Sequence, residues 1–290
     1  MQVWANTLAS AAIYSLVGLS FSLLYQTGRF FNFSQALVIT IGAYAMFAVV
    51  SQWKAPIWFA VPVAVVVAGA FGAAFEIGLF RTLRRGNVGS WGLLLVSLGI
   101  YTVLQNGISL GFGDSTKSVR SGVVRVGHQV LGAFVTDIQI ITLVVCVGIF
   151  ALMIWLLSAT PLGRAIRGIA SNPDLCTVLG INSERTILWA VVIASGLGAM
   201  AGVLTALDTD MTPTMGFPLL MSGVIVMIVG GVGSYPALLG AALLLAMSQH
   251  LVAYYFDSKW MDAVAFLILI AFLIWKPLGF SGRRLKKVEV

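Results

Sequence analysis

The sequence predicts an all-α, polytopic membrane protein that forms one transmembrane domain over residues 1–290. Of these residues, 59% are hydrophobic and only 9% are charged. The mean hydropathy is +1.00, and the apolar residues gather in long runs that short polar loops separate. A soluble protein is not expected at this composition.

Nine apolar runs are candidates for membrane segments, and most reach the roughly 20 residues that cross about 30 Å of hydrocarbon. The first run has no basic residue before it and is too long for a signal-peptide core, so we expect it to be retained. The runs are 4–26, 35–51, 57–80, 90–111, 138–158, 187–207, 217–231, 236–256 and 260–276.

The positions of the basic residues predict the orientation. Of the 17 lysines and arginines, 12 fall in loops on one side of the predicted segments, and that side is expected to be cytoplasmic. We therefore expect a multi-pass protein of the plasma (inner) membrane, with its N-terminus outside, and its C-terminus and the loop 160–185 inside. The net charge of +7 does not indicate nucleic acid, because no basic and aromatic residues alternate outside the segments. The 12 residues are Arg29, Arg81, Arg84, Arg85, Arg164, Arg167, Arg185, Lys276, Arg283, Arg284, Lys286 and Lys287.

Two runs, 35–51 and 217–231, are shorter than the others, and the second covers only about 22 Å as a helix. Each follows one long segment and precedes two, and the two runs point in opposite directions. This pattern predicts an inverted repeat, 4–111 against 187–276, joined by the unpaired segment 138–158. Interrupted segments at matching places commonly meet beside a water-filled path. Spacing alone fits equally well with two short, protein-buried helices that never contact substrate.

The predicted cytoplasmic loop 160–185 is the longest polar interruption in the second half of the chain. Thr160 and Asn172 can each cap a helix that begins at the following proline, and Gly180 suits a left-handed C-terminal stop. Two short amphipathic helices between membrane segments fit a docking platform on the bilayer surface. An ordinary connecting loop is the plainer alternative, since capping signals show only that helices form. The apolar positions are Leu162, Ala165, Ile166 and Ile169 in the first helix and Leu175, Val178 and Leu179 in the second.

No source of energy or chemistry is evident within the chain. Glu76 is the one acid inside a long segment, and we attribute it to snorkelling toward the interface near Arg81. A proton- or sodium-driven carrier would place a carboxylate nearer the middle. The sequence has no phosphate-binding loop, no metal-ligand spacing and no nucleophile beside a base. We therefore expect no enzyme activity, no metal and no cofactor in this chain, and a motor that acts from outside.

Three blocks resemble a known family, the permease subunits of ATP-binding-cassette importers for branched-chain amino acids, in particular the first of their two permeases. The likeness runs in order over nearly the whole chain. The blocks are GRFFNFSQALVITIGAY at 28–44, the stretch 163–202 with GRAIR, LGIN and GAMAG, and the pair MGF at 215–217 and GGVGSYP at 230–236.

The resemblance implies a complex with a second permease, either a related chain or a second copy, and with two cytoplasmic ATPases that bind ATP and Mg. It also implies an extracytoplasmic substrate-binding protein. The loop 160–185 would be the coupling loop, seated in a groove of an ATPase. Arg164 and Arg167 would face its polar surface, whereas Leu162 and Ile166 would enter its apolar groove or cover the permease's own underside. The coupling candidates are Leu162, Gly163, Arg164, Ile166, Arg167, Asp174, Leu179 and Gly180.

The predicted function is therefore half of a translocation path for branched-chain or other neutral amino acids. A permease for urea or short amides is the alternative within the family, and a self-sufficient secondary carrier is the alternative outside it. Helix packing is the plainer role for each aromatic candidate. The residues expected along the path are Asn32, Phe33, Ser34, Gln35, Gly42, Tyr44, Met215, Gly216, Phe217 and Ser222.

Overall fold

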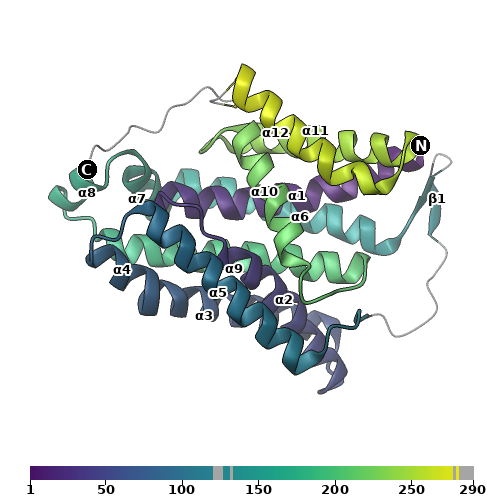
Figure 1. Ribbon diagram of the computed structural model, residues 1–290, viewed down its shortest axis with the longest axis horizontal. Coiled ribbons are helices and arrows are strands. Elements are labelled where there is room, and N and C mark those ends of the chain that lie inside the picture. Colours follow the sequence, from purple (N-terminus) through teal and green to yellow (C-terminus); the bar gives the residue numbers. More distant parts are fainter. Residues whose placement is uncertain (120–126, 131–132, 277–278, 281–290) are drawn as a thin grey trace.

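A computed structural model describes residues 1–119, 127–130, 133–276 and 279–280 (Figure 1). Its helices run between the two ends of an elongated bundle. Eight helical segments of the described residues are long and apolar enough to cross a membrane, and a shorter apolar helix spans Gly216–Gly230. The predicted all-α, polytopic class is confirmed.

Each predicted apolar run coincides with a helix of the structure. The first half contains α1 (Gln2–Gly28), α2 (Ser34–Ser51), α3 (Ile57–Phe75), the π-helical turn η1 (Glu76–Phe80), α4 (Arg81–Arg85) and α5 (Ser90–Phe112). An antiparallel hairpin, β1 (His128–Val130) and β2 (Ala133–Val135), precedes α6 (Asp137–Ala159). The remainder contains α7 (Pro161–Ser171), α8 (Pro173–Val178), α9 (Ser183–Asp208), α10 (Gly216–Gly230), α11 (Tyr235–Tyr255), the 3₁₀ turn η2 (Ser258–Trp260) and α12 (Met261–Trp275).

The centre of the bundle is α1, which is apolar on every side because every side is covered by protein. Leu16, Leu19 and Leu23 are fully buried. The helix packs against α6, α9, α10 and α11, and Figure 1 shows it passing through the middle of the molecule. Most of α1 is therefore shielded from lipid.

Packing between the two halves is reciprocal. While α1 contacts α9, α10 and α11, the helix at the matching place in the second half, α9, contacts α1, α2 and α3. Within the halves, α2 packs on α3 and α10 packs on α11. This exchange of partners fits an inverted repeat, and the repeat with its boundaries stays a prediction.

The two short helices both begin inside the bundle and meet there. The backbone N–H of Phe33, directly before α2, donates to Ser97 Oγ at 3.0 Å, and Ser97 lies about 10 Å along α5 from its start at Ser90. Gly216, the first residue of α10, lies directly on Ala36 and Thr40 of α2. The two short apolar runs in the sequence are therefore helices that begin within the bundle, and the start of α10 lies against α2.

The loops gather at the two ends of the bundle as the basic residues predict. At one end Arg29 Nη2 donates to the carbonyl of Ala170 at 2.6 Å. At the other end Lys117 and Met211 exchange two backbone hydrogen bonds of 2.9 Å. The assignment of the first end to the cytoplasm stays a prediction. The basic residues outside the described part of the chain are Arg120, Arg125, Arg283, Arg284, Lys286 and Lys287.

We predict that Gly202→Ala destabilises the protein, because a Cβ at this position of α9 would overlap the carbonyl oxygen of Ile39 in α2. Backbone cannot move aside as a flexible side chain can, so overpacking should cost about 1–3 kcal/mol. The control is Gly240→Ala in α11, where the new Cβ would meet nothing within 4 Å. Thermal unfolding in detergent should show a lower Tm for the first variant and an equal or higher Tm for the second.

Candidate functional site

The first helix of the predicted coupling loop starts as its capping residues specify. Thr160 Oγ1 accepts a hydrogen bond from the backbone N–H of Gly163 at 3.1 Å, and Pro161 occupies the first turn. A Cβ on Gly163 would overlap the carbonyl oxygens of Leu156 and Leu157 at the end of α6. Only glycine allows α7 to fold back this closely on α6.

The second short helix is also capped as predicted. Asn172 Oδ1 accepts from the N–H of Leu175 at 3.1 Å. At the other end Gly180 is left-handed, with φ at +79°. The N–H groups of Gly180 and Ile181 donate to the carbonyls of Thr177 and Cys176, at 3.0 and 2.9 Å, which is a Schellman ending.

The apolar face of α7 is buried against other helices of the same chain. Ile166 is fully buried, and half-buried Leu162 packs against the same core. The hydrogen bond from Arg29 to Ala170 ties the far end of α7 to the end of α1. Of the two surfaces expected for Leu162 and Ile166, the structure places both on the chain's own underside.

The two arginines of α7 differ in their surroundings. Arg164 is exposed. Arg167 is also exposed, but its Nη1 donates to the carbonyl of Leu157 near the C-terminal end of α6, where a cation is favoured by the helix dipole. Arg164 is therefore better placed than Arg167 to contact a partner.

The apolar face of α8, in contrast, is bare. Leu175, Val178 and Leu179 are 58%, 83% and 75% exposed, while Cys176 is buried and lies beside Gly168 of α7. Leu179 is one of the predicted coupling residues; Leu175 and Val178 were missed, although the same helical spacing marks them. The backbone of Asp174 lies in α8, and its side chain is outside the described part of the chain.

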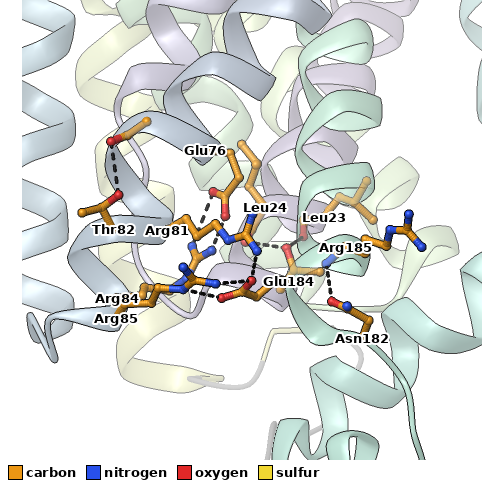
Figure 2. Close-up of polar contacts among 12 residues, drawn as sticks. Leu23, Leu24, Glu76, Arg81, Thr82, Arg84, Arg85, Asn182, Glu184 and Arg185 are labelled. Atoms are coloured by element: carbon orange, nitrogen blue, oxygen red, sulfur yellow. Dashed lines mark hydrogen bonds and ion pairs between the residues drawn. The ribbon is translucent and has the colours of Figure 1, made fainter.

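An ion-pair cluster joins α4 to the start of α9 (Figure 2). Arg85 binds Glu184 with two hydrogen bonds of 2.8 Å, from Nε and Nη2, and Arg81 pairs with the same carboxylate. Asn182 caps α9 through the N–H of Arg185 at 3.0 Å. Sequence reasoning did not connect these arginines with Glu184, because nothing local in the sequence links α4 to a glutamate about 100 residues later.

The expectation for Glu76 was wrong. Its carboxylate does not reach water at the interface but is buried, with the residue 3% exposed, and it pairs with Arg84. Residues eight positions apart lie about 80° apart around an α-helix. The wider π-helical turn that begins at Glu76 reduces this angle. The helix geometry thus supplies the partner that a buried carboxylate requires.

Among the predicted path residues, Gln35 and its neighbours are structural. Gln35 Nε2 donates to Ser20 Oγ at 2.7 Å and to the carbonyl of Ala194 at 3.0 Å, which joins α2 to α1 and α9. Asn32 Oδ1 accepts from Ser34 N and Oγ, at 3.1 and 2.6 Å, and so caps α2. All three predicted residues are buried.

Four further path candidates are also packed into protein. Gly42 lies so close to α9 that a Cβ would sit 2.6 Å from Ala199 Cα. Buried Tyr44 packs on Phe112 with ring centroids 5.0 Å apart. Ser222 Oγ donates to a carbonyl of its own helix, at Pro218, at 3.2 Å, and Gly216 lies against α2.

Three path candidates remain partly exposed, and they lie where the two short helices meet. Phe33 and Phe217 stack with ring centroids 6.1 Å apart, and half-buried Met215 lies two residues before Phe217 in the sequence. Tyr101 of α5 joins the pair, its ring 5.4 Å from Phe217. Sequence reasoning missed Tyr101 because α5 looks like an ordinary segment and its contact with α10 is purely tertiary.

The family model described as "Branched-chain amino acid transport system / permease component" matches residues 3–273. The chain belongs to this family. Membership agrees with the fold, with the two capped helices α7 and α8, and with the paired breaks at α2 and α10.

Curated relatives of this permease are similar over nearly their full length. The high-affinity branched-chain amino acid transport system permease protein LivH of Escherichia coli K12 is 29% identical over 98% of this chain and 96% of its own. The corresponding protein BraD of Pseudomonas aeruginosa is 28% identical with the same coverage. LivM of E. coli K12 is 25% identical over 92% of this chain and 67% of its own. These relatives are described as permeases rather than enzymes.

One solved structure, described as "PsaBC from Streptococcus pneumoniae in complex with Fab", has a TM-score of 0.53 with this permease. The match covers 98% of this chain and 95% of the other, with 12% sequence identity. At that identity the comparison supports the fold of the permease and nothing further.

We predict that Glu76→Gln destabilises the permease more than Glu184→Gln does. Removing Glu76 leaves Arg84 without a counter-ion in a mostly buried position, which should cost on the order of 3 kcal/mol. The side chains of Glu184 and Arg81 are 36% exposed and that of Arg85 is 65% exposed, so loss of these pairs should cost no more than about 1 kcal/mol. Thermal unfolding in detergent measures both.

Salt separates the two sites further. Raising NaCl to about 1 M shortens the Debye length to about 3 Å, so the deficit of Glu184→Gln should shrink while that of Glu76→Gln persists. Equal losses of Tm that respond equally to salt would contradict the assignment of Glu76 to a buried pair.

Proposed function

We propose that this chain is the permease subunit of an ATP-driven importer for branched-chain or other neutral amino acids. It forms half of the translocation path, and two cytoplasmic ATPases, which bind ATP and Mg, act on α7 and α8. The main support is the bare apolar face of α8, formed by Leu175, Val178 and Leu179, on a platform whose other face is fixed to the permease. An exposed apolar patch at the end of a membrane bundle requires a cover.

The contacts of α7 and α8, which together form the platform, suggest how a movement of α8 is transmitted to the membrane helices. Cys176 and Gly168 join α8 to α7, and Gly163 and Arg29 join α7 to the ends of α6 and α1. On the other flank Glu184 links the start of α9 to α4. Movement of the platform therefore pulls on α1 and α9, the two central helices. Rigid-body movement of these helices would open the path to one side at a time.

The remaining parts of the proposal follow from family membership. A second permease, related in sequence as LivM is to this chain, would complete the path, and a substrate-binding protein would deliver the substrate from outside. The N-terminal end of the bundle would face that protein and the platform would face the cytoplasm. The named relatives transport branched-chain amino acids, so these are preferred over urea or short amides as the substrate class.

We predict that the double variant Leu175→Gln and Leu179→Gln loses the ATPase subunits. Both side chains are exposed, so the variant should fold with an unchanged Tm, whereas a groove that receives apolar groups would have to desolvate two amides without partners. Retention of ATPase after affinity purification of the permease, together with ATP-driven uptake of leucine into liposomes, should fall at least tenfold.

The matched control is Thr177→Gln, which places the same side chain at another exposed position of α8 and should leave retention and uptake nearly unchanged. If the double variant retained the ATPase subunits fully, the docking role of α8 would be contradicted. Leucine flux through liposomes that contain only this chain would instead support a self-sufficient carrier.

A further inference from the structure

Two helices at the edges of the bundle, α5 and α12, are alike in exposure but opposite in chemistry. Both are mostly uncovered by the rest of the chain, and Figure 1 shows them well apart. From Ala263 to Trp275, α12 carries apolar side chains only. In its second half α5 carries Tyr101, Thr102, Gln105 and Asn106. The surface of α12 suits lipid, whereas the second half of α5 carries these polar side chains among exposed apolar ones such as Val103 and Leu110.

Asn106 defines the difference most sharply. It is exposed and lies about 9 Å along the helix from the end of α5 at Phe112. Its Nδ2 donates to the carbonyl of Thr102 at 2.7 Å, and among the described residues no partner is recorded for its Oδ1. An amide oxygen that faces hydrocarbon without accepting a hydrogen bond is disfavoured. This face of α5 therefore meets water or another polar group in the working transporter.

The polar face adjoins the aromatic contact at the break of the two short helices. Tyr101 lies one turn before Gln105 on α5, and its ring packs against Phe217, which in turn stacks on Phe33. All three rings are partly exposed. A surface that changes from amides to aromatic rings within one helical turn suits a small molecule with a charged, hydrogen-bonding end and an apolar end.

We infer that this face of α5 lines the substrate path, with Gln105 and Asn106 meeting the ammonium and carboxylate groups of a neutral amino acid and the Tyr101–Phe217–Phe33 rings meeting its apolar side chain. The inference rests on the proposed function and adds to it the wall of the path. Tyr44 of α2 packs on Phe112 at the end of the same helix and so supports α5 from inside the bundle.

Thiol accessibility tests the inference. In a background with Cys146→Ala and Cys176→Ala, the variant Asn106→Cys is assembled with its ATPases and second permease in liposomes and treated with a membrane-impermeant methanethiosulfonate. The control is Leu267→Cys in α12, which is 62% exposed and lies about 9 Å from the start of its helix at Met261. We expect Asn106→Cys to react at least tenfold faster, and leucine to slow that reaction at least threefold.

Three outcomes would overturn the inference: equal rates at the two positions, no reaction at Asn106→Cys, or a fast reaction that leucine does not slow. No reaction would assign the face to a dry contact with another protein chain. Uptake by the same liposomes keeps this result separate from the proposed function. ATP-driven leucine uptake with an unreactive Asn106→Cys overturns the path wall alone, whereas loss of uptake in the wild-type complex overturns the proposed function.

A second measurement does not depend on cysteine. Phe217→Ala should shift the preference of uptake from leucine toward alanine at least threefold, because it removes apolar surface that only the larger side chain reaches. Phe272→Ala, in α12 and apart from the ring contact, should leave the leucine-to-alanine ratio within a factor of two. An unchanged ratio in Phe217→Ala would remove the rings from the path.

Discussion

The close packing of α1 against α9 is the constraint from which the rest of the structure follows. Two central helices can be apolar on all sides only if other helices cover them, and each takes its cover from the opposite half of the chain. Small residues let helices of the two halves pack closely. Gly202 of α9, for example, lies against the backbone of Ile39 in α2. Gln35 then adds hydrogen bonds to both α1 and α9.

The packed helices α1 and α9 leave α2 and α10 little room to run straight across the membrane. Each begins inside the bundle, and the backbone groups at the breaks are satisfied by protein, as where Asn32 caps α2 and Ser97 receives the N–H of Phe33. Broken helices are tolerated at membrane depth only with such partners. The breaks thus bring Phe33 and Phe217, with Tyr101, together at one place in the bundle.

The lengths of the apolar runs and the helix-capping residues predicted much of this architecture. Run length located the segments and the two breaks, and Thr160, Asn172 and Gly180 located both helices of the coupling loop, because capping is decided within a few residues. Burial was harder to predict. The stripes of α7 and α8 look alike in sequence, yet Ile166 is buried and Val178 is exposed, since the difference lies in what α6 and α1 place beneath them. Glu76 and Tyr101 were misjudged or missed for the same reason: their partners come from a changed helical register or from a distant helix.

The buried face of α7 and the exposed apolar face of α8 are subject to different evolutionary constraints. Ile166, Gly163 and Arg29 must suit the permease itself, so changes there would disturb folding. Leu175, Val178 and Leu179 are mostly exposed on the described chain, so changes there would disturb folding little. On the proposed docking role, a lineage could exchange one motor protein for another by altering three side chains, while the membrane domain stayed the same.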